Sequence, residues 1–343
     1  MPLILGLESS CDDSAVALVS GDRQILAQAV VGQDEAHRPF GGVVPEIAAR
    51  AHVDILPGLI RQVLAEADVA IGEVDAIAAT AGPGLIGGVM VALLAGKGLA
   101  IATRKPLIAV NHLEGHALSP RLVDRELAFP YLLLLASGGH CQLLEVRGVG
   151  DYRRLATTID DAAGEAFDKA AKLLGLGYPG GPAIEALARD GDPTAVRLPR
   201  PLVGSGEPHF SFAGLKGAVQ REVISGLHKP EDVAASFQQA VIDCMVDRTR
   251  LALAASNAPT LVVAGGVAAN SALRTALADL AAAEGRAFSV PPAWLCTDNA
   301  AMIAWAGAER LALGMIDGLD APARARWPLD ETAEKVRGAG AKA

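Results

Sequence analysis

The chain has 343 residues and is therefore longer than a single small domain. Because 51% of these residues are hydrophobic, the chain can bury a large core without disulfide bonds or structural metal ions. This composition excludes a chain that is disordered throughout. The net charge is −9 and aromatic residues make up 4%, which argues against a polynucleotide substrate, because autonomous nucleic-acid binders are usually basic.

The start of the chain shows no export signal, because residues 1–7 form a short apolar run without basic residues. The uncharged stretch 76–96 contains Pro83 and several glycines, which predict a strand, a turn and a buried helix rather than a membrane span. The four cysteines form no Cys-x-x-Cys pair. Together these features predict a cytoplasmic protein with reduced thiols and no membrane association.

Two similar β-hairpins are predicted, one at the start of the chain and one near its middle. Their strands are residues 3–7 with 15–19, and 131–136 with 141–146. The tips are polar or glycine-rich, and the repetition indicates an internal duplication. Apolar strands alternate with helices after each hairpin, which predicts α/β domains with largely parallel sheets covered by helices.

The domain boundary is predicted where charge and a proline precede the second hairpin. We expect an N-terminal α/β domain over residues 1–128, a C-terminal α/β domain over residues 129–328 and a flexible tail over residues 329–343. A helix near residues 299–314 can complete the N-terminal domain.

Three glycine-rich segments each follow or precede an apolar element. They are Ala136-Ser-Gly-Gly-His140, Tyr178-Pro-Gly-Gly-Pro182 and Val263-Ala-Gly-Gly-Val-Ala-Ala-Asn270. A single Gly-Gly is usually only a tight turn. Three of them indicate a nucleotide-like ligand, because glycine lets backbone N–H groups approach a phosphate and a following helix adds its dipole.

A histidine pair follows the apolar strand 107–110. His112 and His116 are four residues apart, so both imidazoles lie on one helical face and can reach one metal ion, with Zn, Fe, Ni or Cu favoured over Mg. The alternative is two unrelated histidines. Glu114 stands one position away from where a zinc peptidase needs its base, and we expect it to point away from the metal.

The third ligand does not follow from spacing. Asp298 precedes a helical run that extends to Leu313, and on the residues alone we expect it to be the N-cap of that helix.

Several motifs together resemble one family. They are Glu8-Ser-Ser-Cys-Asp-Asp-Ser14, His37-Arg-Pro-Phe-Gly-Gly-Val-Val-Pro-Glu46, Asn111-His-Leu-Glu-Gly-His116, Ala136-Ser-Gly-Gly-His140, Gly164-Glu-Ala-Phe-Asp-Lys169, Tyr178-Pro-Gly-Gly-Pro182, Gly265-Gly-Val-Ala-Ala-Asn270 and Thr297-Asp-Asn-Ala300. Over about residues 4–313, the chain resembles the tRNA N6-adenosine threonylcarbamoyltransferase family in its bacterial, TsaD-type form.

The resemblance implies an α/β fold of the actin-like, Hsp70-like (ASKHA) class, with two duplicated ribonuclease-H-type domains and an interdomain cleft. It implies transfer of the threonylcarbamoyl group from threonylcarbamoyl-AMP to N6 of adenosine 37 in tRNAs that read ANN codons. It also implies one Fe(2+) per subunit, with Zn as an alternative, held by His112, His116 and Asp298.

The substrate-binding residues that the resemblance implies are Leu135, Ala136, Ser137, Gly138, Gly139, Asp168, Gly181 and Asn270, with Glu185 carried over although many relatives have Asp there. No general base is assignable, and Glu8, Asp12 and Asp13 would be guesses. Phe40, Ala213 and Gly217 also depart from the family, because they lack hydroxyl groups that are common at these positions.

The implied partners are tRNA, the degenerate paralogue TsaB, the P-loop ATPase TsaE and the threonylcarbamoyl-AMP synthase. A Mg-dependent ATPase or kinase of the same superfamily is the main alternative, but such enzymes need no histidine pair. A metallopeptidase and a non-catalytic paralogue are the others. If the substrate is tRNA, the acidic composition predicts only that the isolated chain binds tRNA weakly.

Overall fold

The computed structural model describes residues 1–40 and 42–336, which divide into two compact units. Of the described residues, unit 1 comprises 1–40, 42–127 and 297–331, and unit 2 comprises 128–296 and 332–336. Residues 337–343 of the predicted tail lie outside the described residues. Residues 297–331 lie with the first unit, which includes the helix near residues 299–314 that the sequence allowed to complete the N-terminal domain.

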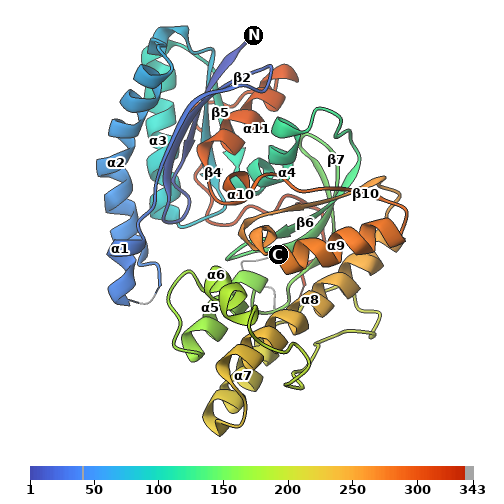
Figure 1. Cartoon of the computed structure of the whole chain (residues 1–343). Helices are drawn as coiled ribbons and strands as arrows, with labels where there is room; N and C mark the ends of the chain where they lie inside the picture. Colours follow the sequence, from blue (N-terminus) through green and yellow to red (C-terminus); the bar gives the residue numbers. More distant parts are fainter. Residues whose placement is uncertain (41, 337–343) are drawn as a thin grey trace. The chain divides into compact units, whose positions relative to one another are not determined.

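Unit 1 is built on a five-stranded sheet in the order β3-β2-β1-β4-β5 (Figure 1). Helices α2 and α3 cover one face of this sheet, and α4 and α11 lie on the other. The elements are β1 (Leu3–Glu8), β2 (Ser14–Ser20), β3 (Ile25–Val31), α1 (Asp34–His37), η1 (Arg38–Phe40), α2 (Pro45–Glu66), η2 (Ile71–Glu73), β4 (Ala76–Gly82), α3 (Ile86–Thr103), β5 (Leu107–Asn111), α4 (His112–Val123) and α11 (Ala300–Ala312).

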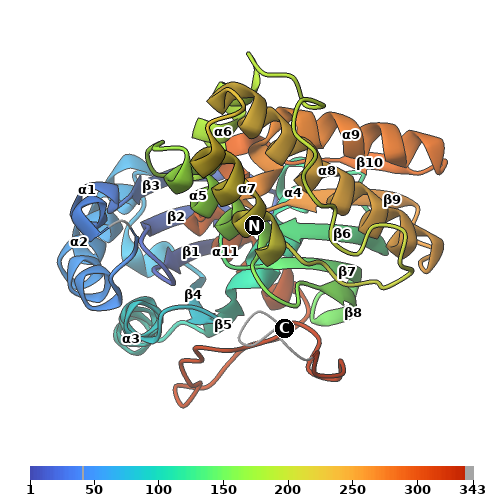
Figure 2. The same ribbon diagram turned by 90° about the horizontal axis from the view of Figure 1, so that it is seen from below.

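Unit 2 repeats this arrangement with the strand order β10-β9-β6-β7-β8, and Figure 2 shows α8 and α9 beside its sheet. The elements are β6 (Tyr131–Ala136), β7 (Cys141–Gly148), β8 (Asp151–Thr157), α5 (Ala163–Leu173), α6 (Gly180–Ala188), α7 (Ala213–Ser225), α8 (Pro230–Ala254), β9 (Thr260–Ala264), η3 (Gly266–Ala269), α9 (Ser271–Ala283), β10 (Ala287–Ser289) and α10 (Ala293–Cys296).

The two sheets have the same topology, so the predicted duplication is confirmed. In each, three consecutive strands pair antiparallel, and the first of them also pairs parallel with a strand that arrives through a helix. The expectation of largely parallel sheets is therefore wrong, since both sheets are mixed. Short hairpin connections force antiparallel pairing. Of the third strands, β8 is mostly polar, and β3 is apolar in sequence but only half-buried or exposed.

Small residues explain why α11 joins unit 1. A Cβ added to Gly307 of α11 would lie 2.5 Å from the Cβ of Ala78 on β4, and one added to Gly6 of β1 would lie 2.5 Å from the carbonyl oxygen of Ala300. The helix backbone therefore sits almost directly on the sheet. Such close packing needs glycine at both places.

Helix α3 is long and apolar enough to cross a membrane by length and composition alone. Within unit 1 it packs on β4 and beside α2. A mainly apolar groove of about 710 Å³ runs between α2 and α3, and its lining includes Val53, Met90 and Leu94. Core helices of soluble proteins pass the same hydropathy test, so the apolar sequence of α3 is weak grounds for a membrane span.

Candidate functional site

The histidine pair lies at the start of α4, where Asn111 changes the chain from strand to helix. The Asn111 side-chain oxygen accepts a hydrogen bond from the backbone N–H of Leu113 at 2.9 Å and caps the helix. Its amide group donates to the carbonyl oxygen of Trp327 at 2.9 Å. Asn111 therefore fixes the first turn of α4 against the C-terminal segment of unit 1, and His112 is the first residue of that turn.

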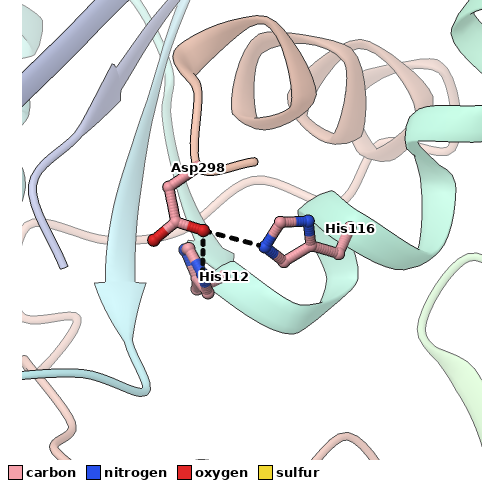
Figure 3. A group of neighbouring side chains, drawn as sticks. All are labelled: His112, His116 and Asp298. Atoms are coloured by element: carbon pink, nitrogen blue, oxygen red, sulfur yellow. Dashed lines mark hydrogen bonds and ion pairs between the residues drawn. The ribbon is translucent and has the colours of Figure 1, made fainter. Parts of the chain in front are cut away.

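Three side chains converge at this point (Figure 3). The Nε2 atoms of His112 and His116 lie 3.4 and 3.1 Å from the same carboxylate oxygen, Oδ1 of Asp298. One ligand atom from each residue lies within 4.8 Å of the other two. Both histidines are buried, whereas the Asp298 side chain is 27% exposed. Residues 182 positions apart thus form one cluster in unit 1.

Asp298 is not the N-cap of α11, contrary to the expectation from its position. Asn299 is the cap, and its side-chain oxygen accepts a hydrogen bond from the backbone N–H of Met302 at 2.9 Å. The Asn299 amide group also donates to the carbonyl oxygen of Thr297 at 2.7 Å. Because its neighbour caps the helix, the Asp298 carboxylate is left to face the imidazoles.

We expect Asn299→Ala to lower the free energy of unfolding by about 1 kcal/mol, the usual loss for an N-cap. Loss of the turn that holds Asp298 should also weaken metal binding. Denaturant unfolding and a metal titration check the two effects. Asn270→Ala, which removes the cap of α9 in unit 2, is the matched control and should leave metal binding unchanged. Equal metal binding in all three proteins would contradict the role of the Asn299 cap.

The charges of the cluster strongly shift the pKa values of its members. Burial by itself raises the pKa of Asp298, but the imidazoles of His112 and His116 outweigh burial and hold the pKa well below its usual value. Burial by itself lowers the pKa of His112, but the carboxylates of Glu8 and Asp298 outweigh it and hold the pKa well above the ordinary value. A cation between the imidazoles and Asp298 can take over the electrostatic role of the imidazolium.

The donor set fits a first-row transition metal. Two imidazole nitrogens and one carboxylate oxygen from one site suit Fe(2+) or Zn, whereas Mg prefers a shell of oxygen ligands. Both imidazoles present the same nitrogen, Nε2, to Asp298. With three protein ligands, coordination positions remain for substrate or water.

Glu114 lies between the two histidines but is paired elsewhere. Its Oε2 accepts a hydrogen bond from Arg310 of α11 at 3.0 Å, and the carboxylate is almost fully buried. The expectation that Glu114 does not act as a peptidase base is thereby supported. Gly115 allows this packing, because a Cβ there would lie 2.9 Å from the Ile303 side chain of α11.

Glu8 contacts His112 of the histidine pair, which the spacing of the motifs did not predict. Its Oε2 lies 2.9 Å from Nδ1 of His112, on the opposite edge of the ring from Asp298. The sequence did contain an indication of this role, because the apolar strand β1 ends in the carboxylate of Glu8. The register of β1 beside β4 then decides that this carboxylate faces α4.

In unit 2, the glycine-rich segments are brought together by close backbone contacts. Gly265 has φ +90°, and a Cβ there would lie 2.4 Å from the carbonyl oxygen of Ala136. A Cβ on Gly164 would lie 2.7 Å from the carbonyl oxygen of Ser137. The β6–β7 tip, the start of α5 and the end of β9 therefore meet. Leu135 and Ala136 are fully buried at the end of the central strand β6, so they support the hairpin tip and offer no exposed surface of their own.

The other predicted substrate-binding side chains have partners within unit 2. Asp168 Oδ1 accepts a hydrogen bond from the N–H of Gly180 at 2.8 Å, next to Gly181 in the first turn of α6. Asn270 caps α9 and its amide donates to Gln238. Glu185 Oε1 accepts from the N–H of Ser271 at 2.9 Å. These contacts position the starts of α6 and α9, and Gly138 and Gly139 at the hairpin tip are exposed.

Among the positions that depart from the family, Phe40, Ala213 and Gly217 lie on η1 and α7, away from the residues of both clusters. Phe40 is 62% exposed in η1. Ala213 opens α7, where Asp160 Oδ1 accepts hydrogen bonds from the N–H groups of Phe212 and Ala213. A side-chain acceptor from another segment therefore serves the start of this helix without a hydroxyl at Ala213.

Solved structures with the same fold are distant in sequence. HypF from T. kodakarensis matches with a TM-score of 0.61 and 15% identity over 91% of this chain and 48% of its own. Component A of the (R)-2-hydroxyglutaryl-CoA dehydratase of Acidaminococcus fermentans matches with a TM-score of 0.56 and 16% identity, over 91% and 100% of the two chains. These similarities concern the fold alone, and the fold is the actin-like class expected from the sequence.

Sequence relatives are close and full-length. The tRNA N6-adenosine threonylcarbamoyltransferase of Sphingopyxis alaskensis is 72% identical over 344 residues and covers 100% of both chains. That of Novosphingobium aromaticivorans is 67% identical over 350 residues, again covering both chains fully. Residues 24–305 match the family described as TsaD, tRNA N6-adenosine threonylcarbamoyltransferase. The chain therefore belongs to the tRNA N6-adenosine threonylcarbamoyltransferase family.

Proposed function

We propose that this chain transfers the threonylcarbamoyl group from threonylcarbamoyl-AMP to N6 of adenosine 37 in tRNAs that read ANN codons. The observation that carries the proposal is the convergence of His112, His116 and Asp298 on one point. All three residues fall within the matched range 24–305. An ATPase or kinase that uses Mg and carboxylates would have no need of the two imidazoles.

The proposed cofactor is one Fe(2+), with Zn as the alternative, bound by the Nε2 atoms of His112 and His116 and a carboxylate oxygen of Asp298. Such an ion acts as a Lewis acid toward carbamoyl or phosphate oxygens. The chain's own contribution is to hold the ligands in place. Asn111 caps α4, which carries both histidines, and Asn299 caps α11 directly after Asp298.

The donor-binding residues are proposed to be the glycine-rich tip Ser137–Gly139, with the buried Leu135 and Ala136 supporting it from β6, together with Asp168, Gly181 and Asn270. The tip suits the phosphate of an adenylate, because Gly138 and Gly139 are exposed and have no side chain that would keep a phosphate from their N–H groups. The free oxygen valences of Asp168 suit ribose hydroxyls or an amine, and burial raises the pKa of this carboxyl. Glu185 acts through Ser271 by orienting the start of α9.

The reaction needs positioning more than a nucleophilic side chain. The exocyclic amine of adenine attacks a mixed carbamate–phosphate anhydride, which already contains a good leaving group. Holding the two reactants in line and stabilising charge on the departing phosphate supply most of the rate enhancement. The four cysteines are free thiols, and burial raises the pKa of Cys141, so it is a poor nucleophile.

Partners are proposed because the chain is acidic and its substrate is a polyanion. With a net charge of −9, the isolated chain should bind tRNA weakly and with strong salt dependence. We propose that TsaB and TsaE assemble with it in the cytoplasm and that a threonylcarbamoyl-AMP synthase supplies the donor. No membrane takes part in this scheme.

Reconstitution tests this function. The purified chain is incubated with tRNA and threonylcarbamoyl-AMP, with and without TsaB and TsaE, and the nucleosides are analysed after digestion. We expect threonylcarbamoyladenosine to form with the partners present, and tRNA retention by the chain alone to fall steeply between 50 and 200 mM salt, by about 10-fold or more. Absence of product in the complete mixture, together with Mg-dependent ATP hydrolysis by the purified chain without TsaE, would favour the ATPase alternative.

A further inference from the structure

The two histidines of the cluster differ in what holds their second ring nitrogen. Nδ1 of His112 lies 2.9 Å from Oε2 of Glu8 and 3.1 Å from Oγ of Ser10. Nδ1 of His116 is buried, and within residues 1–40 and 42–336 it has no hydrogen-bond partner. Both rings therefore direct Nε2 to Asp298, but only the His112 ring is also held by hydrogen bonds at Nδ1.

Glu8 is itself held rigidly. Its Oε1 accepts a hydrogen bond from the backbone N–H of Ser10 at 2.5 Å, and its Oε2 accepts from Oγ1 of Thr80 at 2.5 Å as well as facing His112. Its side chain is 1% exposed. A carboxylate fixed between β1 and β4 in this way can hold an imidazole in only one orientation.

We infer that Glu8 is the positioning residue of the metal centre, which holds His112 by its Nδ1–H so that the Nε2 lone pair faces the metal. An outer carboxylate bonded to a ligating imidazole fixes its tautomer and orientation and raises its basicity. His112 is then the anchored ligand, whereas His116 is oriented mainly by its helix and can adjust when substrate enters. This inference rests on the proposed metal site.

The test is Co2+ binding to the full-length chain, measured by titration and by proton NMR of the Co2+-loaded protein. We expect Glu8→Gln and Glu8→Ala to weaken Co2+ binding by about 10- to 100-fold, the usual effect of losing such a partner. Glu8→Asp keeps the charge but shortens the reach, so it should also bind more weakly. In the wild type, a paramagnetically shifted N–H proton of His112 should exchange slowly, and it should be lost in Glu8→Ala.

Glu114→Gln is the matched control, because Glu114 is equally buried and contacts Arg310 instead of an imidazole. This variant should lose thermal stability but bind Co2+ within about twofold of the wild type. If Glu8→Ala does not fold, the isosteric Glu8→Gln carries the comparison. If Glu8→Gln binds Co2+ with wild-type affinity and keeps the N–H signal unchanged, the role of Glu8 is overturned, but the proposed metal site is not. Absence of Co2+ binding by the wild type would overturn the proposed metal site with it.

Discussion

His112→Ala is expected to weaken metal binding by more than about 100-fold and to lower the rate of threonylcarbamoyladenosine formation by at least as much. The physical reason is that the imidazole supplies one of three protein ligands, and even the loss of an outer partner of a ligand costs about 10- to 100-fold. The variant also removes the group that faces both Glu8 and Asp298. The buried Glu8 carboxylate then loses the imidazole that it faces.

Metal analysis of the purified protein and the tRNA modification assay measure the two effects. His228→Ala is the control, because it is the same substitution at a histidine outside the cluster. His228 lies in unit 2, where it pairs with Glu222. It should retain the metal and the wild-type rate. Full activity of His112→Ala, with no metal bound, would exclude a catalytic role for the metal centre.

Gly265→Ala is expected to destabilise unit 2 by about 2–5 kcal/mol and to abolish binding of threonylcarbamoyl-AMP. The residue has φ +90°, which L side chains rarely adopt, and the new Cβ would lie 2.4 Å from the carbonyl oxygen of Ala136. Relief of this clash must separate the end of β9 from the end of β6. These ends carry the loop before Asn270 and the Ser137–Gly139 tip.

Gly266→Ala is a control at the adjacent residue. A Cβ added to Gly266 would meet no atom of another segment within 4 Å, and the φ of this residue is not positive. The free energy of unfolding of the Gly266→Ala variant should therefore differ from that of the wild type by less than about 0.5 kcal/mol. Denaturant unfolding measures stability, and calorimetry with threonylcarbamoyl-AMP measures binding. Equal unfolding free energies for the two alanine variants would show that the β6–β9 contact is not close in solution.

Much of the fold could be predicted because it depends on local pattern. Apolar runs with polar tips identified the hairpins that open both units, and their repetition indicated the duplicated fold. The mixed pairing of the sheets was missed, because β3 alternates half-buried and exposed residues and its pairing with β2 depends on the path of the chain. The sequence allowed a helix near residues 299–314 to complete the N-terminal domain, and the contacts of Gly6 and Gly307 with distant segments are what place α11 there.

The candidate site divides in the same way. The i, i+4 spacing of His112 and His116 predicted a shared helical face, and the structure has both Nε2 atoms directed to one oxygen. Asp298 was expected on the residues alone to cap a helix, and only the resemblance pointed to a ligand. Asn299 performs the capping. Glu8 was considered only as a guess for a base, and its contact with His112 required the tertiary structure.

The sequence by itself determined the two strand–helix repeats, the histidine face of α4 and the family motifs, since these depend on periodicity over a few residues. The tertiary structure decided which carboxylates surround the imidazoles, which residue caps α11 and which unit contains residues 297–331. The physical reason is that side chains 104 and 182 residues apart meet only after the sheet register and the helix packing have placed them.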